Sequence, residues 1–121
     1  MGRPRSLKLP NLAKLRRFCS SLPETSEKEA WGHPTFRAGA KMFASFGEYE
    51  EEATIGVKRS LDQQAQHLQD SRFYAPPYSG KQGWIGIRLS QVPWPEVEAL
   101  VLDAYRQVAL KRMLKALDSL E

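Results

Sequence analysis

Apolar residues recur at helical spacing in two long segments of the chain, one near each end. In residues 10–22 the apolar side chains share one face, the basic side chains lie on other faces, and Pro10 suits the first helical turn. In residues 95–117 an apolar band stops at Lys111-Arg112 and resumes at Leu114. We predict a helix over each segment, and we expect the final turns of the second helix to leave the core or to fray.

Between these segments, apolar and polar residues alternate in a pattern that is typical of strands. Residues 35–38 and 41–46 flank Gly39-Ala40, and they predict a hairpin because Gly39 tolerates the positive φ of a tight turn. Residues 53–58 predict a third strand. The acidic residues 48–52 predict the connecting loop, because their like charges repel one another and favour solvent.

A short helix and two further strands are predicted after the third strand. Ser60 is a suitable N-cap for the helix, and Gln63 completes an approximate capping box. The apolar stripe of this helix is expected to consist of Leu61, Ala65 and Leu68. Residues 72–78 are rich in aromatic side chains, but Pro76-Pro77 lack two backbone donors and allow only an edge strand. Residues 84–89 alternate most clearly and predict the last strand.

The predicted elements follow the order α-β-β-β-α-β-β-α. Strands that are not separated by helices favour antiparallel pairing, so the predicted fold class is α+β, with an antiparallel sheet of about five strands and helices packed on it. A chain of 121 residues predicts a single domain, which we place at residues 9–121. Residues 1–8 are basic and are expected to form a disordered lead.

Composition excludes several classes of protein. Cys19 is the only cysteine, so neither an internal disulfide nor a cysteine-based zinc cage can form, and a reducing, cytoplasmic location is expected. No apolar run approaches the ~20 residues that span a bilayer, so we expect no membrane partner. The formal net charge of +4 favours polyanions such as nucleic acid.

Basic side chains at two predicted turns are candidates for phosphate contacts. Arg37 and Lys41 flank the first turn, where they can form a wing that reaches phosphates or can be the solvated cations of an ordinary hairpin. Lys81 lies in the second turn, residues 79–83, which is either another phosphate-contacting wing or a plain connector. This second turn lacks the spacing of a phosphate-binding loop and does not open a helix.

The predicted strands also carry candidate residues on their outward faces. Ile85, Ile87 and Leu89 share one face of their strand, so Trp84 and Arg88 lie on the other. Lys58 lies on the comparable face of its own strand. An outward indole beside cations suits stacking on a base or packing on a partner. The alternative is that a helix covers this face and that Trp84 belongs to the core.

Residues with catalytic or metal-binding chemistry do not form a motif in this sequence. His33 and His67 lack a third ligand at a suitable spacing. Cys19 lies on the apolar stripe of the first helix and is expected to be a buried, inert thiol. The acidic residues 48–52 lack the ligand pattern and the glycine of a calcium loop. We therefore expect no catalytic residue, no metal and no cofactor.

Several short strings in this sequence resemble the MmcQ/YjbR family. They are residues 31–37 (WGHPTFR), 39–44 (GAKMFA), Val57-Lys58, Phe73-Tyr74 with Pro77-Tyr78, 83–89 (GWIGIRL), and Ala104-Tyr105-Arg106 with Lys111-Arg112. The resemblance implies a frataxin-like (CyaY-like) architecture known as a double-wing DNA-binding fold, in a small cytoplasmic protein of bacterial type. Ala40 and Leu110 stand where the family pattern has Gly and Pro, and Leu110 therefore implies a more continuous last helix.

The residues and the resemblance together lead to the hypothesis of a non-enzymatic DNA-binding domain with low sequence specificity. The expected nucleic-acid contacts are Arg37, Lys41, Lys58, Lys81, Trp84 and Arg88. One alternative is a protein-interaction or small-ligand module, including a homodimer, that uses a sheet face with Trp84, Tyr74 and Tyr78. An enzyme is the third alternative, and it would require Glu or His side chains that converge in a deep pocket.

Overall fold

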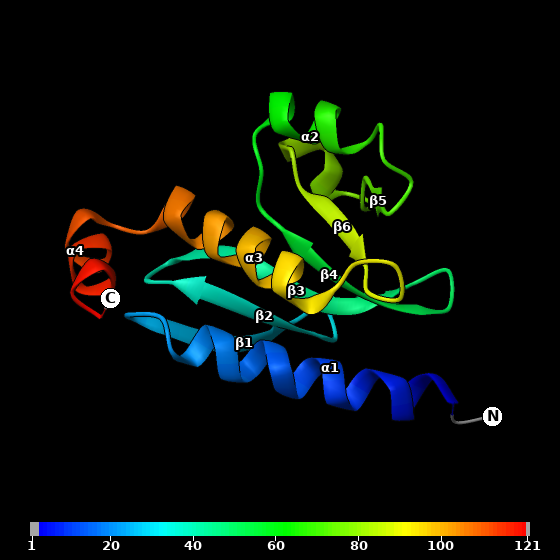
Figure 1. Cartoon of the computed structure of the whole chain (residues 1–121), viewed down its shortest axis with the longest axis horizontal. Helices are drawn as coiled ribbons and strands as arrows, with labels where there is room; N and C mark the ends of the chain where they lie inside the picture. Colours follow the sequence, from blue (N-terminus) through cyan, green and yellow to red (C-terminus); the bar gives the residue numbers. More distant parts are fainter. Residues whose placement is uncertain (1–2, 121) are drawn as a thin grey trace.

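The computed structural model describes the backbone of residues 3–120 and the side chains of residues 10–120. In this part of the chain, six antiparallel strands form one sheet in the order β1-β2-β3-β4-β6-β5 (Figure 1). The helices are α1 (Arg3–Ser20), α2 (Leu61–His67), α3 (Trp94–Val108), α4 (Lys111–Ser119) and the 3-10 helix η1 (Ser79–Gln82). The strands are β1 (Thr25–Ala30), β2 (His33–Ala38), β3 (Lys41–Tyr49), β4 (Glu52–Val57), β5 (Phe73–Tyr74) and β6 (Ile85–Arg88). The predicted α+β class is confirmed, with one strand more than expected.

The core lies between the sheet and the helices α1 and α3. Ile55 and Val57 of β4 pair with Ile87 and Ile85 of β6, and all four side chains are fully buried. The two helices add Leu15, Cys19, Val97, Val101, Ala104 and Tyr105 to the same cluster. This packing confirms the strand predicted at residues 53–58 and the inward face predicted for Ile85 and Ile87.

A bulge in β3 buries two successive side chains. Phe36 of β2 lies opposite Ala44 and Arg37 lies opposite Met42, so Phe43 has no partner residue in β2. Phe43 and Ala44 are both fully buried, whereas a regular strand would turn one of them to the other face. The centroid of the Phe43 ring lies 5.5 Å from that of the Tyr105 ring, so the bulge is a contact point for α3.

The sequence pattern did not predict β1. This strand forms one edge of the sheet beside β2, and four of its six residues are exposed. Its sequence, TSEKEA, has no apolar alternation because an edge strand on this sheet contributes little to the core. The side chain of Glu27 is instead held by α1, since the guanidinium of Arg16 donates to its carboxylate at 2.8–3.1 Å.

The C-terminal segment forms two helices, so the prediction of one continuous helix is wrong. Ala109 and Leu110 are extended, with ψ angles of 147° and 161°, and they separate α3 from α4. Met113 and Leu117 of α4 are buried, so the final turns neither leave the core nor fray. The bend is favourable because it brings these apolar side chains back to the sheet, where a Cβ on Gly39 would lie 2.8 Å from Cε of Met113.

Two other boundaries differ from the sequence expectation. α1 begins at Arg3, so the expected disordered lead of residues 1–8 lies partly within α1 and partly outside the described residues. β3 and β4 extend into the expected loop at residues 48–52 and leave only Glu50-Glu51 as the turn. Glu50 and Glu51 have φ angles of 51° and 67°, as a two-residue hairpin turn requires.

α2 has the predicted capping box, but its predicted apolar face is turned outward. The N–H of Gln63 donates to Oγ of Ser60 at 3.1 Å, and the N–H of Ser60 donates to Oε1 of Gln63 at 3.0 Å. Leu61, Ala65 and Leu68 are exposed, and Gln64 is buried instead. Nε2 of Gln64 donates to the carbonyl oxygens of Gly80 and Trp84, both at 2.8 Å. These hydrogen bonds, rather than apolar packing, attach α2 to the segment before β6.

Replacement of Phe43 by alanine should lower the free energy of unfolding by about 3–5 kcal/mol, because it removes a fully buried ring that contacts Tyr105. The matched variant Leu61→Ala removes a side chain that is 59% exposed and should change stability by less than about 0.5 kcal/mol. Urea unfolding followed by circular dichroism measures both. Similar effects for the two variants would contradict the role of the bulge.

Candidate functional site

Antiparallel pairing brings four of the predicted phosphate-contacting residues to the same end of the sheet. β2 ends, β3 begins, β4 ends and β6 begins at this end. Arg37 and Lys41 lie in the β2–β3 hairpin, Lys58 follows β4, and Lys81 lies in η1 shortly before β6. We call the end defined by these four residues the basic end.

The basic end consists of two groups of cations. At the β2–β3 hairpin, Nη1 of Arg37 donates to the carbonyl oxygen of Ala40 at 3.4 Å, and the side chain of Lys41 is exposed. At η1, Nζ of Lys58 donates to the carbonyl oxygen of Gln82 at 3.3 Å, next to the exposed Lys81. These acceptors are neutral carbonyls, so the hydrogen bonds position Arg37 and Lys58 without neutralising their charge.

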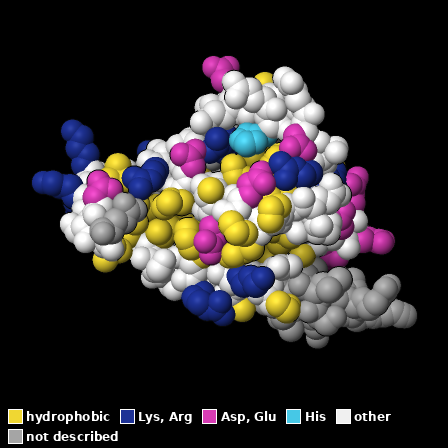
Figure 2. All heavy atoms as spheres, in the orientation of Figure 1, with side chains coloured by type: hydrophobic (Ala, Val, Ile, Leu, Met, Phe, Trp, Pro, Cys, Tyr) yellow, Lys and Arg dark blue, Asp and Glu magenta, His cyan; other side chains and the backbone are white. Residues whose placement is uncertain are grey.

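α4 adds basic residues beside the hairpin. The N–H of Gly39 at the hairpin turn donates to the carbonyl oxygen of Glu24 at 3.0 Å, and the guanidinium of Arg112 donates to the Glu24 carboxylate at 2.8 Å. The hydrogen bond from Arg112 lowers the pKa of that carboxyl. Lys111 and Lys115 are exposed on α4. Figure 2 shows basic side chains that project from this end of the molecule, over α4.

The opposite end of the sheet is acidic. Glu48, Glu50, Glu51 and Glu52 lie at the β3–β4 hairpin, where Glu50-Glu51 forms the turn. Acidic side chains gather at this end in Figure 2, on the right of the view. Because the basic end and this acidic end lie at opposite ends of the same strands, the sheet separates positive from negative charge.

Arg88 lies at the acidic end and not at the basic end. Its guanidinium lies 5.6 and 5.1 Å from the ring centroids of Tyr49 and Tyr74, whose rings stack on each other at 3.9 Å. Its Nη1 donates to the carboxylate of Glu50 at 2.9 Å, and its side chain is only 17% exposed. The charge of Arg88 is therefore matched within the fold, and the structure does not support the predicted phosphate contact.

Trp84 is buried, with 6% of its surface exposed. Its ring lies over β4, where a Cβ on Gly56 would be 3.6 Å from Cε3 of the indole. α2 is attached to the same segment through the hydrogen bond from Gln64 to the Trp84 carbonyl. Of the two alternatives that the sequence left open, the structure selects the covered indole, so a base cannot stack on Trp84.

The aromatic sheet face expected for a partner or ligand is also largely closed. The hydroxyl of Tyr74 donates to Oγ1 of Thr54 at 3.0 Å, and burial raises the pKa of this phenol. The ring lies so close to β6 that a Cβ on Gly86 would collide with it. Tyr78 behaves differently, because its side chain is 91% exposed.

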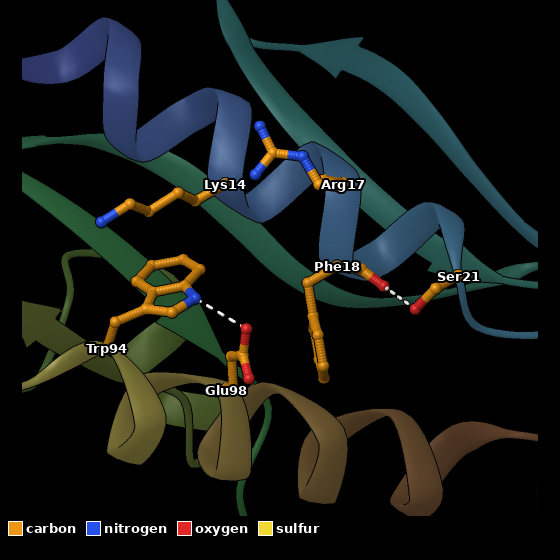
Figure 3. Close-up of a pocket in the computed structure, with 6 residues that line it drawn as sticks. All are labelled: Lys14, Arg17, Phe18, Ser21, Trp94 and Glu98. Carbon is orange, nitrogen blue, oxygen red and sulfur yellow. Dashed lines mark hydrogen bonds between the residues drawn. The ribbon is translucent and has the colours of Figure 1, made fainter. Parts of the chain in front are cut away.

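A groove of about 460 Å³ between α1 and α3 is a second candidate site, and the sequence analysis did not anticipate it (Figure 3). Lys14, Arg17 and Phe18 line it from α1, and Trp94 and Glu98 line it from α3. Nζ of Lys14 lies 5.5 Å from the centroid of the Trp94 ring, and the indole N–H donates to Oε2 of Glu98 at 2.7 Å. Two cations therefore lie beside two aromatic side chains, one of which is fixed by a carboxylate.

Side chains with catalytic or metal-binding chemistry are dispersed. Cys19 is buried, and burial raises the pKa of its thiol to about 12. His67 packs against the ring of Phe73 at 5.0 Å, and burial lowers its pKa. Within the described residues, no three His, Cys, Asp or Glu side chains are grouped so that they could hold a metal ion. None of the helices in this part of the chain is long and apolar enough to cross a membrane.

Comparison with solved structures shows that this architecture occurs elsewhere. The crystal structure of the Deinococcus radiodurans protein DR2400, with the domain DUF419, matches with a TM-score of 0.72 and 19% identity, over 88% of this chain and 87% of that chain. A protein from Pseudomonas syringae matches with a TM-score of 0.58 and 17% identity, over 88% of this chain and 98% of that chain. No match was found among curated proteins. At these identities the two structures show a shared fold.

A family model defines the class more closely. The model of the YjbR family matches residues 20–107, from the end of α1 almost to the end of α3. The chain therefore belongs to the YjbR family, and the resemblance observed in the sequence is confirmed. The match includes the β2–β3 hairpin and η1, whereas α4 lies beyond the matched residues.

Cys19 should react with a thiol reagent only after the chain unfolds, because its sulfur is buried and its raised pKa keeps it protonated. We expect native labelling by dithionitrobenzoate at mildly alkaline pH to be at least about 100-fold slower than labelling in urea. Since the pKa is higher in the folded state, the thiol favours folding below its unfolded pKa, and this contribution is lost as the pH rises towards 12. Rapid labelling of the native protein would contradict the assignment.

Proposed function

We propose that this YjbR-family protein is a non-enzymatic, cytoplasmic DNA-binding domain that contacts phosphates through its basic end. One observation carries the proposal: Arg37, Lys41, Lys58 and Lys81 are distant in sequence, but the fold brings them to one end of the sheet, opposite the glutamates of the β3–β4 hairpin. Such a separation of charge orients the protein towards a polyanion. Counterion release from the phosphate backbone then supplies binding free energy.

The two groups of cations act as two wings. The first is the β2–β3 hairpin with Arg37 and Lys41, next to the exposed lysines of α4, and the second is η1 with Lys81 and the neighbouring Lys58. Side chains of this kind contact phosphates, which carry no sequence information, so specificity is low. Trp84 and Arg88 are not part of this contact set, because one is buried and the other is paired. Binding through these wings requires no chemical step.

The double variant Lys41→Glu/Lys81→Glu, with one reversal on each wing, should weaken binding to a short duplex by at least about tenfold. It should also reduce the slope of log K against log salt by about two. For the wild-type protein we expect a loss of affinity on the order of 100-fold between 50 and 200 mM salt. Fluorescence anisotropy of a labelled duplex measures all three quantities.

The matched control for this experiment is Lys14→Glu. Lys14 is also an exposed lysine, but it lies in the groove between α1 and α3 and not at the basic end. This variant should retain nearly all of the wild-type affinity. If Lys14→Glu weakened binding as much as a single reversal at Lys41, net charge rather than the basic end would be responsible. Absence of binding at low salt would refute the proposal.

The groove supports a second candidate function, the binding of a small aromatic anion. A flat ring can pack between Phe18 and Trp94, and an acidic group on it can reach Lys14 and Arg17, which lie one turn apart on α1. The carboxylate of Glu98 holds the indole N–H of Trp94, so this side of the groove is already in position for a ligand.

Titration with indole-3-acetate, followed by NMR, tests the second candidate. The Nε1–H resonance of Trp94 should shift, whereas those of the buried Trp84 and of Trp31, which does not line the groove, should remain in place. Lys14→Glu should weaken this binding by about tenfold, the size expected for one charge-assisted contact. Lys41→Glu should leave it unchanged. Equal shifts at all three tryptophans would indicate non-specific association and not a site.

A further inference from the structure

Tyr78 adopts a backbone conformation that tyrosine rarely takes. Its φ and ψ angles are 68° and −65°, and the N–H of Ser79 donates to the carbonyl oxygen of Pro77 at 2.7 Å, which closes a γ-turn around it. This form of γ-turn is rare and strained, and a side chain with a Cβ makes it less favourable than glycine would. Strained residues persist only where the surrounding structure imposes them, and they are concentrated at functional sites.

The neighbouring segment is well anchored, although Tyr78 itself is not packed. The N–H of Gly80 donates to the carbonyl oxygen of Pro76 at 2.9 Å, and the carbonyl oxygen of Gly80 accepts from the buried Gln64 at 2.8 Å. A Cβ on Gly80 would lie 3.3 Å from Cβ of Ala75, so the loop is also closely packed at its base. The ring of Tyr78 is nevertheless 91% exposed, so its burial does not offset the strain.

The position of Tyr78 places this exposed ring on the second wing. It immediately precedes η1, which carries Lys81. Nζ of Lys58 donates a hydrogen bond to the carbonyl oxygen of Gln82 in the same helix. A flat aromatic ring on the same wing as two cations matches the two needs of a nucleic-acid strand, a stacking partner for a base and positive charge for the adjacent phosphates. Trp84, which the sequence analysis considered for this role, is covered.

We propose that Tyr78 stacks on an unpaired base and that the preferred ligand of the basic end is therefore single-stranded nucleic acid. This inference rests on the proposed function, because the phosphate contacts of both wings must hold the strand. In a duplex every base is already stacked between its neighbours, so an exposed ring gains a partner only after a base has been unstacked. A single strand offers its bases directly.

Trp31 provides a matched control within the same chain. It is 85% exposed and also has a left-handed backbone, with φ of 52°. It lies between β1 and β2, at the end of the sheet opposite the basic end. If any exposed aromatic residue sufficed for stacking, Trp31 and Tyr78 would contribute equally.

The experiment compares a labelled oligothymidine strand with a duplex of the same length by fluorescence anisotropy at low salt. Wild-type protein should bind the single strand about tenfold more tightly than the duplex, and Tyr78→Ala should lose about this factor on the single strand alone. Tyr78→Phe keeps the ring and should retain the preference, and Trp31→Ala should bind as the wild type does. Circular dichroism confirms that each variant is folded.

The outcomes separate this inference from the proposed function. If Tyr78→Ala binds the single strand as well as wild type, while Lys41→Glu/Lys81→Glu weakens binding to both nucleic acids, the stacking role is refuted and the basic end remains. Equal losses on single strand and duplex would also refute stacking, because they would indicate a change in the wing itself. If the wild-type protein binds neither nucleic acid, both proposals fail.

Discussion

The contact between Tyr105 and the bulge at Phe43 is the interaction on which the rest of the structure depends. Tyr105 is fully buried on α3, its ring faces that of Phe43, and its hydroxyl donates to the carbonyl oxygen of Pro23 at 2.7 Å. One side chain thus joins α3, the centre of the sheet and the segment between α1 and β1. The bulge also sets the course of the β2–β3 hairpin, because it adds a residue to β3 and increases the local twist. α4 packs against the turn of this hairpin. The position of the first wing therefore follows from the contact between Tyr105 and Phe43.

The same architecture explains which cations are available to a ligand. Arg16, Arg59, Arg72, Arg88 and Arg112 all pair with carboxylates and connect elements of the fold. Lysines provide most of the charge at the basic end, and the hydrogen bonds that Lys58 and Arg37 form there go to neutral carbonyl oxygens. This division is physically reasonable, since a guanidinium forms a directional pair with a carboxylate, whereas an ammonium group on a flexible stem stays hydrated and adaptable.

Local features of the sequence predicted local structure well, and tertiary contacts decided the rest. The capping box of Ser60 and Gln63 and the turn at Gly39 involve neighbouring residues, so propensity was sufficient. The break at Ala109-Leu110 contains neither glycine nor proline, and only the burial of α4 against the hairpin explains it. Alternation identified the face of Trp84 but could not show what covers that face. Similarly, Pro76-Pro77 limited residues 72–78 to an edge strand, but no local pattern predicts a left-handed tyrosine at position 78.

The charged residues of β1 interrupt the apolar alternation that predicts a strand, and they also affect how copies of this protein associate. Among the strands that the structure describes, β1 pairs only with β2, so one row of its backbone N–H and C=O groups has no partner strand there, and such an edge is a template for adding strands from other molecules. Glu27, Lys28 and Glu29 lie along it in close succession. If β1 of a second copy paired with this edge, the charged side chains would lose their hydration. The free-energy cost of this desolvation exceeds the gain from the new inter-strand hydrogen bonds. The charged residues that make β1 a poor strand-former therefore also oppose the addition of further strands at this edge of the sheet.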